Sequence, residues 1–157
     1  MTLVELFPQS MCIPDLKARD KKGAIREMLS HLVAAGRLKE DAAKKAEKAV
    51  HKRESQGSTA IGKGLAIPHA KGCPLLKEVM GVFARSREGV PFDAVDGGLV
   101  HVLFLVISPD ERAAEHLGIL RRIAKLHLDE KTLRYMARDE KLASLHEIFK
   151  EIDDSFS

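Results

Sequence analysis

Cysteine is scarce in this chain of 157 residues, which contains only Cys12 and Cys73. Two thiols do not form a disulfide scaffold, and their low number indicates a reducing compartment, so we expect the protein in the cytoplasm. The first residues lack a basic leader followed by an apolar stretch, so no export signal is expected. Long apolar runs are absent too. The longest, residues 99–107, falls short of the roughly 18 residues that cross a bilayer and contains His101, so we expect no membrane insertion.

An excess of one charge is also missing. The 26 lysines and arginines nearly balance 23 aspartates and glutamates, and the formal net charge is +3. That balance gives no indication of nucleic-acid binding. The local excess of basic residues in 39–53 is interpreted as a solvated helix face, and a nucleic-acid-binding domain is the weakest alternative. Without repeats, low-complexity tracts or linkers, residues 1–157 are expected to form a single domain.

Apolar periodicity predicts helices towards both ends of the chain and strands in the middle. The expected helices are one from Asp20 to Gly36, one over about 40–53, one over 112–128, and two more capped by Asp129 and Asp139. The expected strands are 65–67, 79–84, 100–107 and a short one at 90–92, with a loop at 55–64. This pattern predicts an α/β fold: a single three-layer domain with a mixed β-sheet of about four to five strands, flanked by helices on both faces.

Among the seven histidines, one stands out by its context. His31, His51, His127 and His146 fall on expected helices and are interpreted as surface residues, and His101 as a hydrogen-bonded residue of a buried strand. His69 instead follows a glycine-containing loop, a short apolar strand and Pro68. Because proline cannot donate to a sheet ladder, we expect the chain to leave the sheet there and to place the His69 imidazole at the rim of the sheet.

An imidazole at such a place suits phosphoryl transfer. Near pH 7 one ring nitrogen is free to attack phosphorus, while the other holds the proton; the sequence leaves open which nitrogen does which. The transferring group needs donors aimed at its oxygens. The Arg53 guanidinium and the hydroxyls of Ser58 and Thr59 are candidates.

Other chemistries match the sequence less well. Gly57 and Gly62-Lys63 have the spacing of a nucleotide-binding loop, but Gly64 stands where a magnesium-binding hydroxyl is required. His69, Cys73 and His116 form a weak candidate zinc set. No serine-hydrolase elbow motif occurs.

The segment 54–70 resembles the active-site signature of the type 2 IIA domains of the bacterial phosphotransferase system, the family of fructose, mannitol and nitrogen-regulatory IIA proteins. Every fixed position of that signature is met, by Glu54, Ile61, Gly62, Leu65, Ala66, Ile67, Pro68, His69 and Ala70. The resemblance extends over roughly 15–152 and includes Arg53 before the signature, Phe92-Asp93, Asp96-Gly97 and the helix start His116-Leu117-Gly118-Ile119-Leu120.

The resemblance implies a phosphohistidine relay. His69 would be the phosphorylated nucleophile, His116 would hydrogen-bond the phosphoryl group, Arg53 would supply positive charge, and Ser58 and Thr59 would line the site. An HPr-like phosphocarrier would be the donor and a IIB component of a sugar permease the acceptor. The alternative is a nitrogen-regulatory IIA protein that controls a kinase or transporter according to its phosphorylation. Neither role implies a cofactor or a metal, because the phosphoryl group arrives activated on a partner's imidazole.

Overall fold

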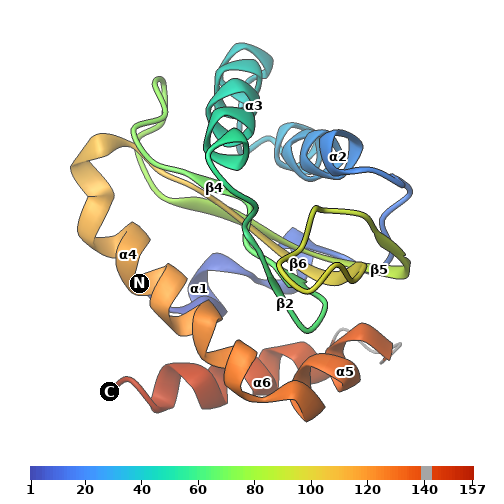
Figure 1. Ribbon diagram of the computed structural model, residues 1–157. Helices are drawn as coiled ribbons and strands as arrows, with labels where there is room; N and C mark the ends of the chain where they lie inside the picture. Colours follow the sequence, from blue (N-terminus) through green and yellow to red (C-terminus); the bar gives the residue numbers. More distant parts are fainter. Residues whose placement is uncertain (139–142) are drawn as a thin grey trace.

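In a computed structural model that describes residues 1–138 and 143–157, the chain forms three layers, with one sheet between two groups of helices (Figure 1). The helices of the described residues are α1 (Leu3–Leu6), α2 (Lys21–Ala34), α3 (Glu40–Ser55), α4 (Ala113–Ala124), α5 (Glu130–Arg138) and α6 (Ala143–Asp154). The strands are β1 (Cys12–Ile13), β2 (Ala60–Gly62), β3 (Leu65–Ala66), β4 (His69–Ala70), β5 (Met80–Val90) and β6 (Val100–Ile107). The predicted mixed α/β class and its helices on both faces are confirmed.

The sheet is built around β6. Its order is β1-β5-β6-β3-β2, and β4 also pairs with β6. The central pair β5 and β6 is antiparallel, with Phe83 opposite Phe104, whereas β3 and β4 run parallel to β6. Because β3 and β4 lie one after the other along the same edge of β6, the segment that leads to His69 is held by a strand that is buried at all but one of its residues.

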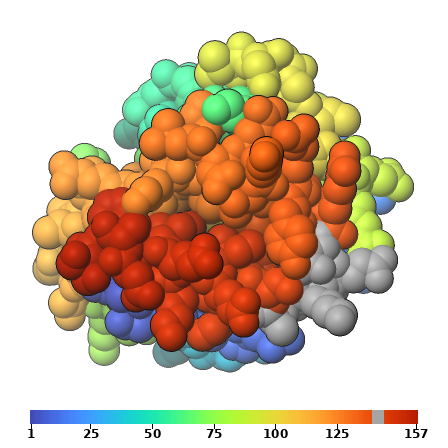
Figure 2. All heavy atoms as spheres, turned by 90° about the horizontal axis from the view of Figure 1, so that it is seen from below, coloured from blue at the N-terminus to red at the C-terminus, as the bar shows by residue number. Residues whose placement is uncertain are grey.

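Each face of the sheet carries its own apolar core, because successive side chains of β5 and β6 point to opposite faces. Val82, Ala84 and Leu105 pack under α2 and α3. Phe83 and Phe104 pack with residues of α1, α4, α5 and α6 on the other face. Figure 2 shows that face from below, where the C-terminal part of the chain, orange to red, covers most of what is seen.

Helix α1, which the sequence analysis did not anticipate, is joined to the C-terminal helix by Asp153. The Asp153 carboxylate accepts hydrogen bonds from the backbone N–H groups of Leu3 (2.8 Å) and Val4 (3.0 Å). It also forms an ion pair with Arg122 of α4, at 3.0 Å. One side chain of α6 therefore connects α1 and α4 beneath the sheet.

Several boundaries differ from the sequence predictions. The predicted loop at 55–64 contains β2, and the single helix expected over 112–128 is divided into a 3-10 turn, α4 and a second 3-10 turn. No separate strand forms at 90–92, because Val90 ends β5. The caps at Asp20 and Asp129 are confirmed, since their carboxylates accept from the N–H groups of Gly23 (2.7 Å) and Thr132 (3.1 Å). The expected cap at Asp139 lies outside the described residues.

The chain does not leave the sheet at Pro68, so that prediction was wrong. Proline lacks only the donor, and the Pro68 carbonyl still accepts a hydrogen bond from the Val106 N–H at 3.1 Å. Pairing with β6 then resumes at His69, which lies opposite Val106.

None of the helices in residues 1–138 and 143–157 has both the length and the apolar character that a membrane span requires.

Candidate functional site

His69 is held in a defined tautomer by its own strand. Its ring Nδ1 lies 2.7 Å from the backbone carbonyl oxygen of Ile67, two residues earlier. A carbonyl oxygen only accepts, so Nδ1 must carry the proton and donate. In the neutral ring, Nε2 then keeps its lone pair and is available as a nucleophile. The geometry thus distinguishes the two nitrogens, which the sequence could not do.

The surroundings of His69 keep this ring neutral. Partial burial lowers its pKa below the ordinary value, and the positive charges of Arg53 and Lys71 lower it further. The hydrogen bond to the Ile67 carbonyl and the negative charge of Glu54 act in the opposite direction, but the net change is downward. At pH 7 the ring is therefore more fully deprotonated at Nε2 than an exposed histidine.

A second imidazole lies beside the first. His116, on α4, is 4% exposed, and its ring centre is 5.6 Å from that of His69 with the rings inclined at 56°. Its Nδ1 lies 2.7 Å from the hydroxyl oxygen of Ser108. Burial, followed by the charges of His69 and Lys71, lowers the pKa of His116 to about 4. His116 is consequently neutral at physiological pH.

Both rings line one pocket of about 850 Å³, to which α3, the end of β4 and α4 also contribute. Its lining residues are Ala49, Lys52, Arg53, Gln56, His69, Ala70, Lys71, Gly72, Ala113, His116, Leu117 and Leu120. Three of these are cations, and the described residues of the lining include no aspartate or glutamate. Such a lining favours a small, highly charged anion.

Arg53 enters this pocket from the end of α3. Its Nη1 donates to the Gly57 carbonyl at 2.7 Å, which fixes the guanidinium against the loop that follows the helix. The structure therefore brings together three of the residues predicted for the site: His69, His116 and Arg53.

It does not bring Ser58 and Thr59 into the pocket. The Ser58 hydroxyl donates to the Phe92 carbonyl at 2.6 Å, and the Thr59 hydroxyl donates to the buried Glu54 carboxylate. Glu54 in turn pairs with Lys21 of α2 at 3.1 Å. Both hydroxyls attach the loop to Phe92 and Glu54, neither of which lines the pocket.

Sequence reasoning missed three residues of this region. Lys52 and Lys71 line the pocket and Ser108 contacts His116. The position of Lys71 two residues after the histidine was an available signal for a second cation. For Ser108, the only indication in the sequence was its position, since its hydroxyl stands between a predicted buried strand and Pro109.

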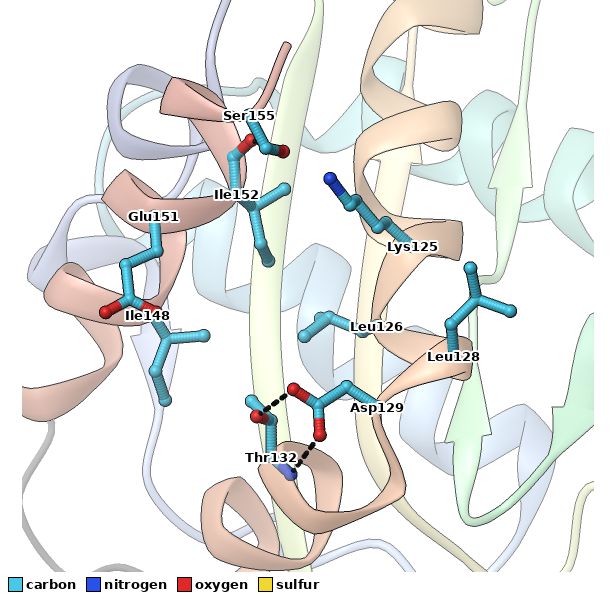
Figure 3. Close-up of a pocket in the computed structure, with 9 residues that line it drawn as sticks. All are labelled: Lys125, Leu126, Leu128, Asp129, Thr132, Ile148, Glu151, Ile152 and Ser155. Atoms are coloured by element: carbon cyan, nitrogen blue, oxygen red, sulfur yellow. Dashed lines mark hydrogen bonds between the residues drawn. The ribbon is translucent and has the colours of Figure 1, made fainter.

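Another histidine and another pocket of the described residues differ from this arrangement. His101 Nδ1 lies 2.8 Å from the Ser86 carbonyl oxygen, a contact that agrees with its interpretation as a hydrogen-bonded residue. Within the described ranges, no group of three or more metal-ligating side chains is close enough to hold an ion. A smaller pocket of about 250 Å³ lies between α6 and the segment that joins α4 to α5 (Figure 3). Its polar contacts include the Asp129–Thr132 cap, and no histidine lines it.

The chain is similar in sequence to proteins of one known family. Residues 5–152 match the family described as "Phosphoenolpyruvate-dependent sugar phosphotransferase system, EIIA 2". A nitrogen regulatory protein of Bradyrhizobium diazoefficiens is 35% identical over 130 residues, 83% of this chain and 82% of that protein. The PTS system fructose-specific EIIABC component of Bacillus subtilis is 31% identical over 98% of this chain, and the chain spans 24% of that protein's length.

Solved structures share the fold. The nitrogen regulatory protein IIA-Ntr of Neisseria meningitidis has a TM-score of 0.81 at 28% identity, covering 92% of this chain and 97% of that one. IIA mannitol of Escherichia coli has a TM-score of 0.74 at 21% identity, covering 90% of this chain and 96% of that one. At this identity, the similarity concerns the fold alone.

Proposed function

The chain belongs to the EIIA type 2 family of the phosphoenolpyruvate-dependent sugar phosphotransferase system, and from this premise we propose that it is a phosphoryl carrier that accepts the group on Nε2 of His69. The observation that carries the proposal is the pair of imidazoles in a pocket lined by cations. We further propose that residues 1–157 form one such domain and that it works in the cytoplasm, in keeping with its two free thiols.

The transfer step follows from the tautomer of His69. The Nε2 lone pair attacks the phosphorus of a phosphorylated imidazole on the donor, the donor's N–P bond breaks, and its electron pair returns to the donor ring. The proton stays on Nδ1, which donates it in the hydrogen bond to the Ile67 carbonyl, so no proton has to leave His69 for the bond to form. This arrangement requires only positioning and charge, which are the main contributions to catalysis of phosphoryl transfer.

The residues that line the pocket can stabilise the negative charge of a phosphoryl group. A phosphoryl group brings about −1.5 to −2 units of charge at pH 7. Lys52 and Arg53 of α3 and Lys71, which follows β4, line the pocket and carry positive charge. Ala113, the first residue of α4, also lines the pocket, so the positive end of that helix dipole lies next to the anion.

Family members exchange phosphoryl groups with phosphocarrier proteins and IIB domains. We propose an HPr-like phosphocarrier as the donor and a IIB domain of a sugar permease as the acceptor. The proposal involves neither nucleic acid nor a cofactor. Exposed Leu117, next to His116, and half-buried Leu120 add apolar surface at the mouth of the pocket, which suits docking of another protein.

A regulatory role is the second candidate. The nitrogen regulatory protein of B. diazoefficiens matches this chain over most of both lengths. In that role, the phosphorylated state of His69 would decide whether a kinase or transporter binds, because the added charge changes the surface around the pocket.

One experiment tests the carrier function. The protein is incubated with phosphorylated HPr-like carrier, and its intact mass is measured at neutral pH. Wild type should gain about 80 Da in an acid-labile form, the mass of one phosphoryl unit. His69→Ala should gain nothing, and His146→Ala, which removes an exposed histidine of α6, should behave as wild type. A full adduct on His69→Ala, or none on wild type, would contradict the proposal.

A second experiment separates the two roles. Onward transfer of labelled phosphoryl group to a purified IIB domain supports sugar transport. Capture of a kinase or transporter by only one phosphorylation state, without transfer to IIB, supports regulation.

A further inference from the structure

Ser108 directly follows the last residue of β6 and contacts His116, the second of the two histidines. The residue is fully buried. Its backbone N–H donates to the Ala70 carbonyl at 3.1 Å, and its carbonyl accepts from the Cys73 N–H at 2.9 Å. Both backbone hydrogen-bonding groups of Ser108 therefore have partners without its hydroxyl. Across residues 1–138 and 143–157, the sole hydrogen-bond partner of that hydroxyl is Nδ1 of His116, at 2.7 Å.

The single partner determines the direction of the hydrogen bond. A serine hydroxyl has one proton to donate, and a neutral imidazole has one nitrogen that donates and one that accepts. If His116 Nδ1 donated, the Ser108 proton would be buried without an acceptor in the described structure. If Ser108 donates to Nδ1, its only donor is satisfied and unused lone pairs remain, which is the less costly arrangement.

We infer that Ser108 is a positioning residue that donates to His116 Nδ1 and thereby fixes the His116 proton on Nε2, where it is a hydrogen-bond donor to a phosphoryl group on His69. This inference rests on the proposed carrier function, because it assigns a role to a residue beneath the same site.

The two rings then have opposite tautomers for two different structural reasons. A carbonyl oxygen, that of Ile67, requires a proton on Nδ1 of His69 and leaves its Nε2 as a nucleophile. A hydroxyl proton, that of Ser108, requires a bare Nδ1 on His116 and leaves its Nε2 as a donor.

This pairing matches what the reaction needs. The oxygens of a phosphoryl group are acceptors only, so a second ring with a bare Nε2 would present a lone pair to them. The low pKa of His116 means that the ring is neutral at pH 7 and cannot donate from both nitrogens. The donor at Nε2 therefore depends on the tautomer, and the tautomer depends on the hydroxyl of Ser108.

Ser108→Ala is a specific test, because both backbone hydrogen bonds of residue 108 are retained while the hydroxyl is lost. Ser108→Thr keeps a hydroxyl and is the matched variant. Each protein is prepared with ¹⁵N-labelled histidine, and the protonation of each His116 nitrogen is read from its ¹⁵N chemical shift at pH 7 before phosphorylation. The rate of phosphoryl transfer from phosphorylated HPr-like carrier is then measured on the same samples.

For wild type we expect His116 with a protonated Nε2 and an unprotonated Nδ1. Ser108→Ala should move proton population to Nδ1 and slow transfer about tenfold, the loss of one well-placed hydrogen bond. Ser108→Thr should restore both readings, and the His69 shifts should be unchanged in all three proteins, which reports on folding.

A wild-type spectrum with the proton on His116 Nδ1 would overturn the inference without any variant. Unchanged tautomer and rate in a folded Ser108→Ala protein would overturn it as well. Absence of phosphorylation in wild type would overturn the carrier function and, with it, the role assigned to Ser108 in transfer, while the spectrum would still decide the direction of the hydrogen bond.

Discussion

Acidification should destabilise this protein through His116, and the size of the effect follows from its burial. The pKa of His116 in the folded chain is about 4, against an ordinary value of 6.5. At pH values between these two, His116 is mostly protonated in the unfolded chain and mostly neutral in the folded chain. Stability therefore falls as the pH drops through that window. From pH 7 to pH 5 this one group should lower the free energy of unfolding by about 2 kcal/mol, approaching about 3 kcal/mol at pH 4.

The assay is urea unfolding of wild type and of His116→Gln, a variant that carries no charge at either pH. Other titrating groups, including His69, are present in both proteins, so the difference between the two pH profiles isolates His116. Wild type should lose about 2 kcal/mol more than the variant between pH 7 and pH 5. Parallel profiles would refute the reasoning, because they would mean that the His116 ring is protonated as easily in the folded chain as in the unfolded one.

Two further substitutions test separate parts of the structure. Arg53→Gln should slow phosphorylation of His69 by on the order of tenfold to a hundredfold and raise the pKa of His69, because a positive charge that lowers this pKa is removed. Lys45→Gln, an exposed position on the same helix, is the control, and an unchanged rate and titration for Arg53→Gln would exclude a role for that charge. Asp153→Ala should lower the free energy of unfolding by roughly 1–3 kcal/mol, because it leaves the N–H groups at the start of α1 and a cation of α4 without their shared carboxylate. Asp154→Ala, the exposed neighbour, should stay within about 0.5 kcal/mol of wild type in the same urea titration, and equal losses for the two variants would contradict this account.

The long helices and strands could be predicted from the sequence, because each contains enough residues to show a recognisable pattern of apolar side chains. Helix α2 has a capping Asp20 and buried residues at helical spacing, and β6 is a run of apolar residues buried on both sides. Of the short strands in the described residues, β3 was predicted, within the expected strand 65–67, whereas β1, β2 and β4 were not. Strands of two or three residues have no measurable alternation, and β3 and β4 exist because the edge of β6 offers them hydrogen-bond partners.

The site was predicted in outline and not in detail. The segment around His69 carried a family signature, and that resemblance pointed to Arg53 directly before the signature and to His116 much later in the chain. Nothing in the residue types indicated that the loop hydroxyls would turn towards Phe92 and Glu54. The same holds for Ser108, whose contact with His116 arises only when the end of β6 and the start of α4 are folded against each other.

The atom of His69 to which the phosphorus binds decides whether the protein carries its phosphoryl group as proposed. The protein is labelled with ¹⁵N-histidine, phosphorylated by the carrier, and examined for ³¹P–¹⁵N coupling at neutral to alkaline pH. We predict that the phosphorus is bonded to Nε2 of His69 and that Nδ1 still carries its proton towards the Ile67 carbonyl. Phosphorus on Nδ1 of His69, or on any other side chain, would contradict the account.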